Sequence, residues 1–193
     1  MIVYVVRHGE AEGNREGRFL GQVDPQLTDR GREQAKRQGN ALKGLGIARI
    51  LSSDLVRAFT TASIIGEALN LPVEPTAALR EVNHGVIDGW LASDIRNSEY
   101  GRARDKDKYN YCPPGGESYV GIEARILGVL DAPQTQPLLI VTHMGPMRVM
   151  LHRLCGYSQA DAVGAKIAHD EILTLTKNGT SWSGSRSAPG ARP

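Results

Sequence analysis

This sequence of 193 residues has no long apolar segment and no excess of charge of either sign. Only six apolar residues, MIVYVV, precede Arg7, too few for the core of a signal peptide or for a bilayer span. The 23 basic and 21 acidic residues leave a net charge of +2, too balanced to indicate a nucleic acid or a membrane surface as partner. We therefore expect a cytoplasmic protein, in which any anionic ligand is bound by a local cluster of cations.

The usual patterns of nucleotide, metal and disulfide sites are also missing. No Gly-rich stretch followed by Lys and Ser or Thr is present, which disfavours a P-loop and nucleotide-driven chemistry. The five histidines lack the short spacings of common zinc sites, and the two cysteines, Cys112 and Cys155, lie far apart. We expect reduced thiols, no metal and no cofactor.

Apolar residues alternate along the chain between strand-like and helix-like patterns. The β-branched run from Ile2 to Val6 is typical of a strand buried on both faces of a parallel sheet, and LLIVTH at 138–143 is clearer still. Further strands are predicted at 48–54 and 73–81, with a final edge strand at 171–177, and helices at about 28–43, 55–69, 117–129 and 147–154. This alternation predicts an α/β fold, a three-layer α/β/α sandwich with a mostly parallel sheet.

The last residues differ in composition from the rest. Residues 178–193, NGTSWSGSRSAPGARP, are small, polar and rich in Gly, Ser and Pro. Such a segment has little apolar surface to bury, so we expect a flexible tail.

Chemically reactive side chains recur where the predicted strands end. Arg7 and His8 follow the first strand, and Arg57 lies in the first helical turn after the second. Glu81 closes the third predicted strand, and His143 ends LLIVTH. In an open α/β sheet, ligands bind beyond the carboxyl ends of the strands, so we expect these five residues to meet in one crevice.

Two arginines, two histidines and an acid suit a phosphoryl group, because guanidinium groups bind phosphate oxygens through paired, charged hydrogen bonds. A neutral imidazole is a competent nucleophile near pH 7, and His8 is the predicted one. Arg7 adjoins it, and Gly9 would let a phosphate approach the backbone. Glu81 would protonate the leaving group and later activate water, while a protonated His143 would stabilise charge on the oxygens.

Each of these residues alone has a simpler explanation. A single His or Arg at a strand end is more often a cap or an ion-pair partner, and only the grouping favours a site. His152 and His169 lack such a grouping, and we interpret them as a helix-surface residue and a loop residue. The many charges of residues 91–112 are interpreted as a solvated helical face rather than a second anion site.

Several segments resemble, in the same order, those of the histidine phosphatase superfamily, also called phosphoglycerate mutase-like. They are RHGEAEGN, FLGQVDPQLTDRGREQA, SSDLVRAFTTA, LREVNHGVIDG, PPGGES and VTHMG. The resemblance covers a single domain at 1–177, with a short cap insertion around 84–116. It implies a metal-independent enzyme with His8 as the phosphohistidine nucleophile and Glu81 as proton donor. It further implies phosphate ligands at Arg7, Arg57 and His143, and substrate-binding positions at Asn14, Gly21 and Gln22.

Three positions depart from the family pattern, and they concern substrate choice. His84 stands where an aromatic or small residue is common, Ile87 replaces Trp, and Met144 replaces Gly. The reacting residues are intact.

Only 33 residues separate Glu81 from Gly115, a shorter cap than in cofactor-dependent mutases, which favours hydrolysis over phosphoryl transfer. The predicted function is that of a histidine acid phosphatase-type phosphomonoesterase acting on a small phosphorylated metabolite. Two alternatives remain: mutase-type phosphoryl transfer, and a non-catalytic phosphate-binding or interaction module on the same fold. The presence of the acid argues against the second. The sequence indicates neither the oligomeric state nor the physiological substrate.

Overall fold

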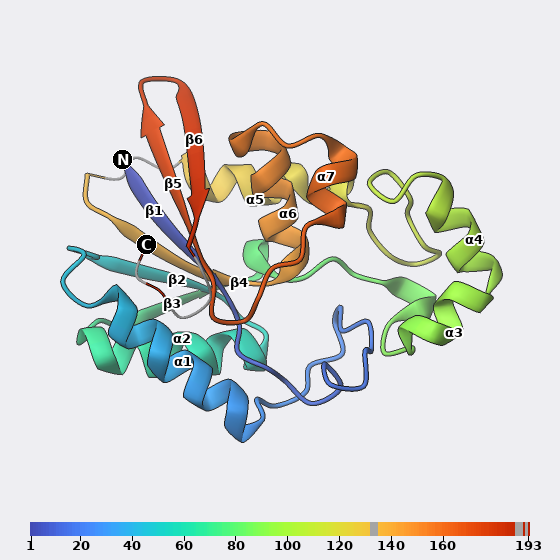
Figure 1. Cartoon of the computed structure of the whole chain (residues 1–193), viewed down its shortest axis with the longest axis horizontal. Coiled ribbons are helices and arrows are strands. Elements are labelled where there is room, and N and C mark those ends of the chain that lie inside the picture. The colour runs from blue at the N-terminus through green and yellow to red at the C-terminus, as the bar shows by residue number, and fades with distance from the viewer. Residues whose placement is uncertain (132–134, 188–190, 192) are drawn as a thin grey trace.

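One sheet of six strands separates two layers of helices (Figure 1). The computed structural model describes residues 1–131, 135–187, 191 and 193. The strand order is β3-β2-β4-β1-β5-β6. The strands are β1 (Ile2–Arg7), β2 (Arg49–Ser53), β3 (Val73–Thr76), β4 (Leu138–Thr142), β5 (Ile172–Asn178) and β6 (Ser181–Arg186). Strands β1 to β4 run parallel, β5 pairs antiparallel with β1, and β6 pairs antiparallel with β5, which confirms the predicted three-layer α/β/α sandwich with a mostly parallel sheet.

The two faces of the sheet support separate cores. Val3 and Val5 of β1 pack with α5 (Tyr119–Asp131), α6 (Met144–Cys155) and α7 (Gln159–Gly164). Tyr4 and Val6 point the other way, toward α1 (Asp29–Leu42) and α2 (Val56–Leu69). Successive side chains of a strand alternate between faces, so a strand covered on both sides reads as one continuous apolar run.

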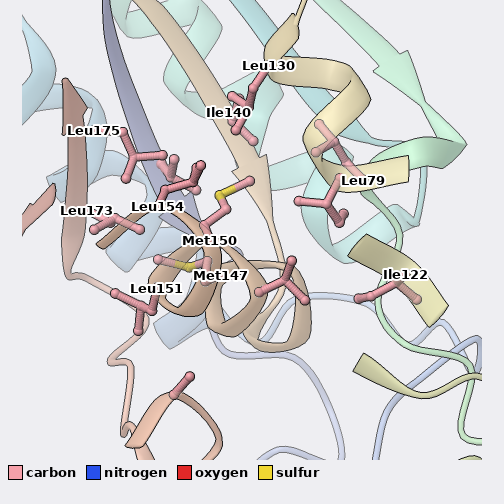
Figure 2. Packing of buried hydrophobic residues seen from close by; sticks show 14 of the residues in the cluster. Leu79, Ile122, Leu130, Ile140, Met147, Met150, Leu151, Leu154, Leu173 and Leu175 are labelled. Carbon is pink, nitrogen blue, oxygen red and sulfur yellow. The ribbon is translucent and has the colours of Figure 1, made fainter. Parts of the chain in front are cut away.

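Helix α6 supplies much of the first core. Figure 2 shows Met150 and Leu154 of α6 beside Leu173 and Leu175 of β5, with Ile140 of β4 close by. These side chains are nearly or fully buried, and each contributes about 1.5–3 kcal/mol relative to an exposed position. Helix α6 begins at Met144, and His143 is the one residue between it and β4.

A cap projects beyond the carboxyl ends of the parallel strands. Two 3-10 turns, η1 (Ala77–Leu79) and η2 (Gly85–Ile87), lead into it, and α3 (Ala92–Asn97) and α4 (Glu99–Lys106) form its outer part (Figure 1). The segment after β1 runs alongside: the Phe19 N–H donates to the Trp90 carbonyl at 2.9 Å and the Gly89 N–H donates to the Phe19 carbonyl at 2.7 Å. The cap is therefore joined to the N-terminal segment through main-chain groups.

The C-terminal residues correct one expectation. The predicted flexible tail over 178–193 is wrong for 181–186, which form β6 and pair with β5 from Leu173↔Arg186 to Asn178↔Ser181. Gly179, with φ of 61°, occupies the first position of the two-residue turn, a conformation that favours glycine. Strand β5 is therefore not at the edge.

The polar composition of 178–193 led to a wrong prediction for β6, because this strand is held mainly by backbone hydrogen bonds to β5, which small polar residues can form. Two side chains add to these: Trp182 packs against the core, and Arg186 forms an ion pair with Glu171. Residues 188–190 and 192 of the predicted tail lie outside the described residues. Within the part of the chain that is described, no helix combines the length and apolarity needed to cross a membrane.

Candidate active site

Two adjacent parallel strands bring two histidines together. Strands β1 and β4 pair in a register that sets Arg7 opposite Thr142, and His8 and His143 are the next residues. The His8 N–H donates to the Thr142 carbonyl at 2.9 Å, and the two imidazole rings lie 5.1 Å apart between centroids. The strand-end pattern thus predicted this pairing correctly.

The hydrogen bond of His8 fixes its tautomer. Nδ1 lies 2.7 Å from the Gly9 carbonyl oxygen, which can only accept, so Nδ1 carries the proton and Nε2 keeps its lone pair. Burial, and then the nearby His143 and Arg57, hold the pKa of His8 well below its usual value. His8 is therefore neutral near pH 7, with a nucleophilic nitrogen.

Gly9 has a different role from the expected one. A Cβ at Gly9 would lie 2.2 Å from the carbonyl oxygen of Gly31 in the first turn of α1. The missing side chain lets β1 approach α1. This close contact explains the glycine without the expected approach of a phosphate.

His143 is held from β2. Its Nε2 lies 2.8 Å from the hydroxyl of Ser53, and its buried Nδ1 has no hydrogen-bond partner among the described residues. Burial, followed by the charges of Arg57 and Arg7, lowers the pKa of His143 well below its usual value. This ring is therefore neutral in the ligand-free protein, and its protonated form in the reaction stays a prediction.

Arg7 brings a positive charge to the wall of a cavity. Its Nη1 donates to the Ile167 carbonyl at 2.9 Å, whereas its buried Nε has no partner in the described part of the chain. Burial lowers the pKa of Arg7 to about 10, so the guanidinium remains charged near pH 7. With a neutral carbonyl as its bonded partner, Arg7 keeps its charge for an anionic ligand.

Arg57 is fully buried and does not line this cavity. Its charge nevertheless helps to lower the pKa of both His8 and His143. Its four Nη hydrogen bonds run to the carbonyls of Leu20, Gly21 and Val23 and to Asp24, at 2.8–3.3 Å. Arg57 therefore organises the loop 20–24 as well as the charge of the site.

Gly21 and Gln22 do not line the cavity as a substrate-binding role predicts. Their backbone N–H groups donate to the carboxylate of Asp88, both at 2.7 Å, and the Gln22 side chain donates to the Glu81 carbonyl at 3.0 Å. They hold the loop in place. Asn14 does line the cavity, and its Oδ1 accepts from the Ala11 N–H at 2.8 Å.

Glu81 reaches the cavity from a loop after η1, because β3 is shorter than predicted and ends at Thr76. The Thr76 side chain accepts from the Ala78 N–H and starts the 3-10 turn instead. The Glu81 carboxylate accepts from its neighbour Val82 at 2.8 Å and from Gly145, in the first turn of α6, at 3.0 Å. A helix N-terminus favours a carboxylate there.

Arg7, His8, Asn14 and Glu81 open onto a cavity of about 980 Å³, much larger than a phosphate group, whereas His143, like Arg57, is fully buried and does not line it. Of the three positions that depart from the family pattern, His84 and Met144 line it, and Ile87 is buried. The cap charges also face it: Arg104, which stacks over the Phe19 ring at 5.4 Å, and residues 105–108 lie on its wall. The interpretation of 91–112 as only a solvated face is wrong for this part.

A family model for the histidine phosphatase superfamily (branch 1) matches residues 3–186. The chain belongs to this superfamily. The protein named "Probable phosphoglycerate mutase GpmB" from Salmonella newport is 34% identical over 157 residues, which cover 73% of this chain and 68% of the relative.

Two solved structures of the same fold are phosphatases by name. The α-ribazole phosphatase from Shigella flexneri is 25% identical, with a TM-score of 0.88 over 100% of this chain and 98% of that one. The mycobacterial glucosyl-3-phosphoglycerate phosphatase in complex with VO3 is 26% identical, with a TM-score of 0.83 over 98% of this chain and 99% of that one. A further protein of this fold, from Thermus thermophilus, is 31% identical, with a TM-score of 0.74 over 91% and 93% of the two chains.

Sequence reasoning missed one histidine in this superfamily member. His169 lines the cavity, its ring lies 5.5 Å from that of His8, and its Nδ1 donates to the His8 carbonyl at 2.6 Å. Burial lowers its pKa to about 3, so His169 is neutral. Its position in the loop before β5 gave no sign of this contact, because only the antiparallel pairing of β5 with β1 brings the loop to His8.

Arg148 of α6 was also missed. It lines the cavity, donating to the Tyr119 hydroxyl at 2.9 Å and to the Ala165 carbonyl at 3.1 Å. Arg148 lies about one turn after the start of α6, which begins next to His143. Helical spacing could therefore have identified this arginine as facing the same end of the sheet as His143. In the ranges described, no group of three His, Cys, Asp or Glu residues is arranged to hold a metal ion.

Proposed function

We propose that this chain is a metal-independent phosphomonoesterase that hydrolyses a small phosphorylated metabolite through a phosphohistidine on His8. The observation that carries the proposal is the hydrogen bond from Nδ1 of His8 to the Gly9 carbonyl, which leaves Nε2 as a neutral nucleophile beside Arg7. A buried imidazole with a fixed tautomer needs no base to activate it.

In the first step, Nε2 of His8 attacks phosphorus while the bond from phosphorus to the ester oxygen breaks. Glu81, in its acid form, gives its proton to that oxygen, so that an alcohol leaves rather than an alkoxide. The resulting phosphoimidazolium keeps its Nδ1 proton, which remains hydrogen-bonded to the Gly9 carbonyl. That acceptor stabilises the positive charge on the ring.

In the second step, water attacks the phosphorus and the bond to Nε2 breaks, which returns the electron pair to His8. The Glu81 carboxylate takes the proton of the water and is ready for the next cycle. Glu81 lines the same cavity as His8, so water and the leaving alcohol reach one carboxyl group.

An unpartnered buried nitrogen on the cavity wall supports binding of the phosphoryl group. Nε of Arg7, Nε of Arg57 and Nδ1 of His143 have no hydrogen-bond partner within the described residues, and of these residues Arg7 lines the cavity. Buried polar nitrogens without partners are rare in folded proteins, and an anion in the cavity would satisfy that of Arg7. A bound phosphate dianion would also raise the pKa of His143 and favour its protonated, donating form.

Hydrolysis is favoured over mutase activity by the short cap and by the phosphatases among the similar structures. One relative nevertheless carries the name of a phosphoglycerate mutase. Assays with 3-phosphoglycerate as substrate, in excess chelator, distinguish the two activities. Release of phosphate supports the proposal, whereas faster formation of 2-phosphoglycerate establishes the mutase.

The nucleophile is tested by trapping. The protein is mixed with a labelled phosphomonoester and the reaction is quenched rapidly without acid. A base-stable, acid-labile phosphoenzyme should be trapped, and His8→Ala should abolish it. His143→Ala should still form it, about 10²–10³ times more slowly, because that variant loses one stabilising donor rather than the nucleophile. Label on His143, or full trapping in His8→Ala, would overturn the assignment.

A further inference from the structure

Asp88 follows η2 in the cap, and its carboxylate holds the loop 20–24. Its Oδ1 accepts from the Gly21 N–H at 2.7 Å, and its Oδ2 accepts from Gln22 at 2.7 Å and Val23 at 3.0 Å. Hydrogen bonds to an ionised group are stronger than neutral ones. Three successive N–H groups on one carboxylate therefore fix the conformation of this loop.

The same loop holds Arg57 through its carbonyl groups. Leu20 and Gly21 accept from Nη2 at 3.0 and 2.8 Å, and Val23 accepts from Nη1 at 2.8 Å. The loop thus lies between a cap carboxylate and the buried guanidinium. With these bonds and Asp24 in place, Nε is the one guanidinium group that lacks a partner within the described part of the chain.

The loop has little room to shift. A Cβ at Gly21 would lie 2.7 Å from the Val82 carbonyl oxygen and 3.1 Å from Oδ1 of Asp88. The Gln22 side chain donates to the Glu81 carbonyl at 3.0 Å, so the loop also touches the backbone of the proposed acid. Asp88 itself does not line the cavity.

We propose that Asp88 is a positioning residue that sets Arg57, through the loop 20–24, where its charge acts on the transferred phosphoryl group. The inference rests on the proposed function. It assigns to the cap a part in phosphate binding, in addition to any contact with the leaving group.

The first test compares Asp88→Ala and Asp88→Asn with the unaltered protein. Asp88→Ala should lower kcat/KM for an aryl phosphate by about 10²-fold, the loss typical of a displaced catalytic group, and should raise the Ki of inorganic phosphate. Asp88→Asn keeps one acceptor oxygen and should show a smaller loss in the same direction. Asp94→Asn, at an exposed cap carboxylate in the first turn of α3, is the matched control and should be unchanged.

A double-mutant cycle separates positioning from general stability. If Asp88 acts through Arg57, Asp88→Ala should cost less than about threefold in an Arg57→Ala background, because the group it positions is gone. An equal loss in both backgrounds would overturn the proposal, as would an unchanged kcat/KM in folded Asp88→Ala. Circular dichroism at the assay temperature checks folding, and if Asp88→Ala is unfolded the same cycle with Asp88→Asn decides.

Failure of the proposed function would be recognised separately. If the unaltered protein hydrolyses no ester, the four proteins of the cycle are compared by calorimetry for binding of inorganic phosphate. They are the unaltered protein, Asp88→Ala, Arg57→Ala and the double variant. Coupling between the two positions in phosphate affinity then supports the inference about Asp88. Independent effects, or no binding by the unaltered protein, overturn it.

Discussion

The imidazole of His169 donates from Nδ1 to the backbone carbonyl of His8, 2.6 Å away. This hydrogen bond fixes the main chain at the proposed nucleophile, and its donor lies 161 residues further along the sequence. Because the carbonyl can only accept, Nδ1 of His169 carries the proton.

His169→Ala should lower kcat by about fivefold, since the loss of one buried hydrogen bond costs about 1 kcal/mol and leaves the His8 carbonyl without its partner. His169→Asn retains a donor and should recover most of the activity. His152→Ala, which removes a ring on α6 bonded to the Tyr157 carbonyl, is the control for loss of an imidazole elsewhere. Equal activity of the alanine and asparagine variants would show that the donor is unimportant.

Gly145 leaves the space that the Glu81 carboxylate occupies. A Cβ at Gly145 would lie 2.1 Å from Oε1, so Gly145→Ala must displace the carboxyl group. We expect this variant to behave like Glu81→Gln and to slow hydrolysis of alkyl phosphates far more than that of activated aryl phosphates, whose leaving groups need no proton. Steady-state kinetics on matched alkyl and aryl esters measures the difference.

Gly128→Ala is the control for that substitution. It lies in α5 with no heavy atom within 4 Å of an added Cβ, and alanine there should stabilise the fold by about 0.4–1 kcal/mol. Equal slowing of alkyl and aryl esters in Gly145→Ala would remove Glu81 from the role of proton donor.

Four histidines should make the fold sensitive to acid. Burial lowers the pKa values of His8, His84, His143 and His169, the last to about 3, whereas in the unfolded chain each titrates near 6.5. Below pH 6.5 the unfolded state therefore binds more protons, and the free energy of unfolding falls as the pH is lowered, by up to about 1.4 kcal/mol per pH unit for each histidine. Urea unfolding at pH 7.5, 6 and 5 measures this slope. His169→Asn removes one of these histidines and should flatten the slope; an identical slope would contradict the assignment.

Strand β6 predicts a result for truncation. A chain ending at Thr180 leaves the edge of β5 unpaired and loses both the packing of Trp182 and the ion pair of Arg186 with Glu171. Its melting temperature should fall by several degrees relative to a chain ending at Ser187. Identical melting temperatures would show that β6 contributes nothing to stability.

The placement of His8 and His143 could be predicted because it depends on one rule. Parallel strands end at the same edge of the sheet, so residues just beyond β1 and β4 become neighbours whatever the rest of the chain does. Arg57 was placed near them by the same reasoning. The attachment of Arg57 to the loop 20–24 could not be predicted, because that contact uses backbone carbonyls, and every residue provides one.

The missed features have a common physical origin. His169 contacts His8 through the main chain, and β6 forms through ladder hydrogen bonds. Neither leaves a pattern of apolar side chains. The cap charges failed as a prediction for another reason: α4 has a strong helical charge pattern, but periodicity alone does not say whether a face meets water or lines a cavity.

The cap is fastened to the N-terminal segment by main-chain hydrogen bonds between 17–19 and 89–92. Such bonds survive almost any change of side chain that spares the backbone conformation. Asp105 and Lys106, on the cavity side of α4, can therefore change without loss of these bonds, whereas Arg104 also stacks over Phe19 of the N-terminal segment. The shape and charge of this part of the cavity wall can thus vary while the main-chain junction between the cap and the N-terminal segment is kept.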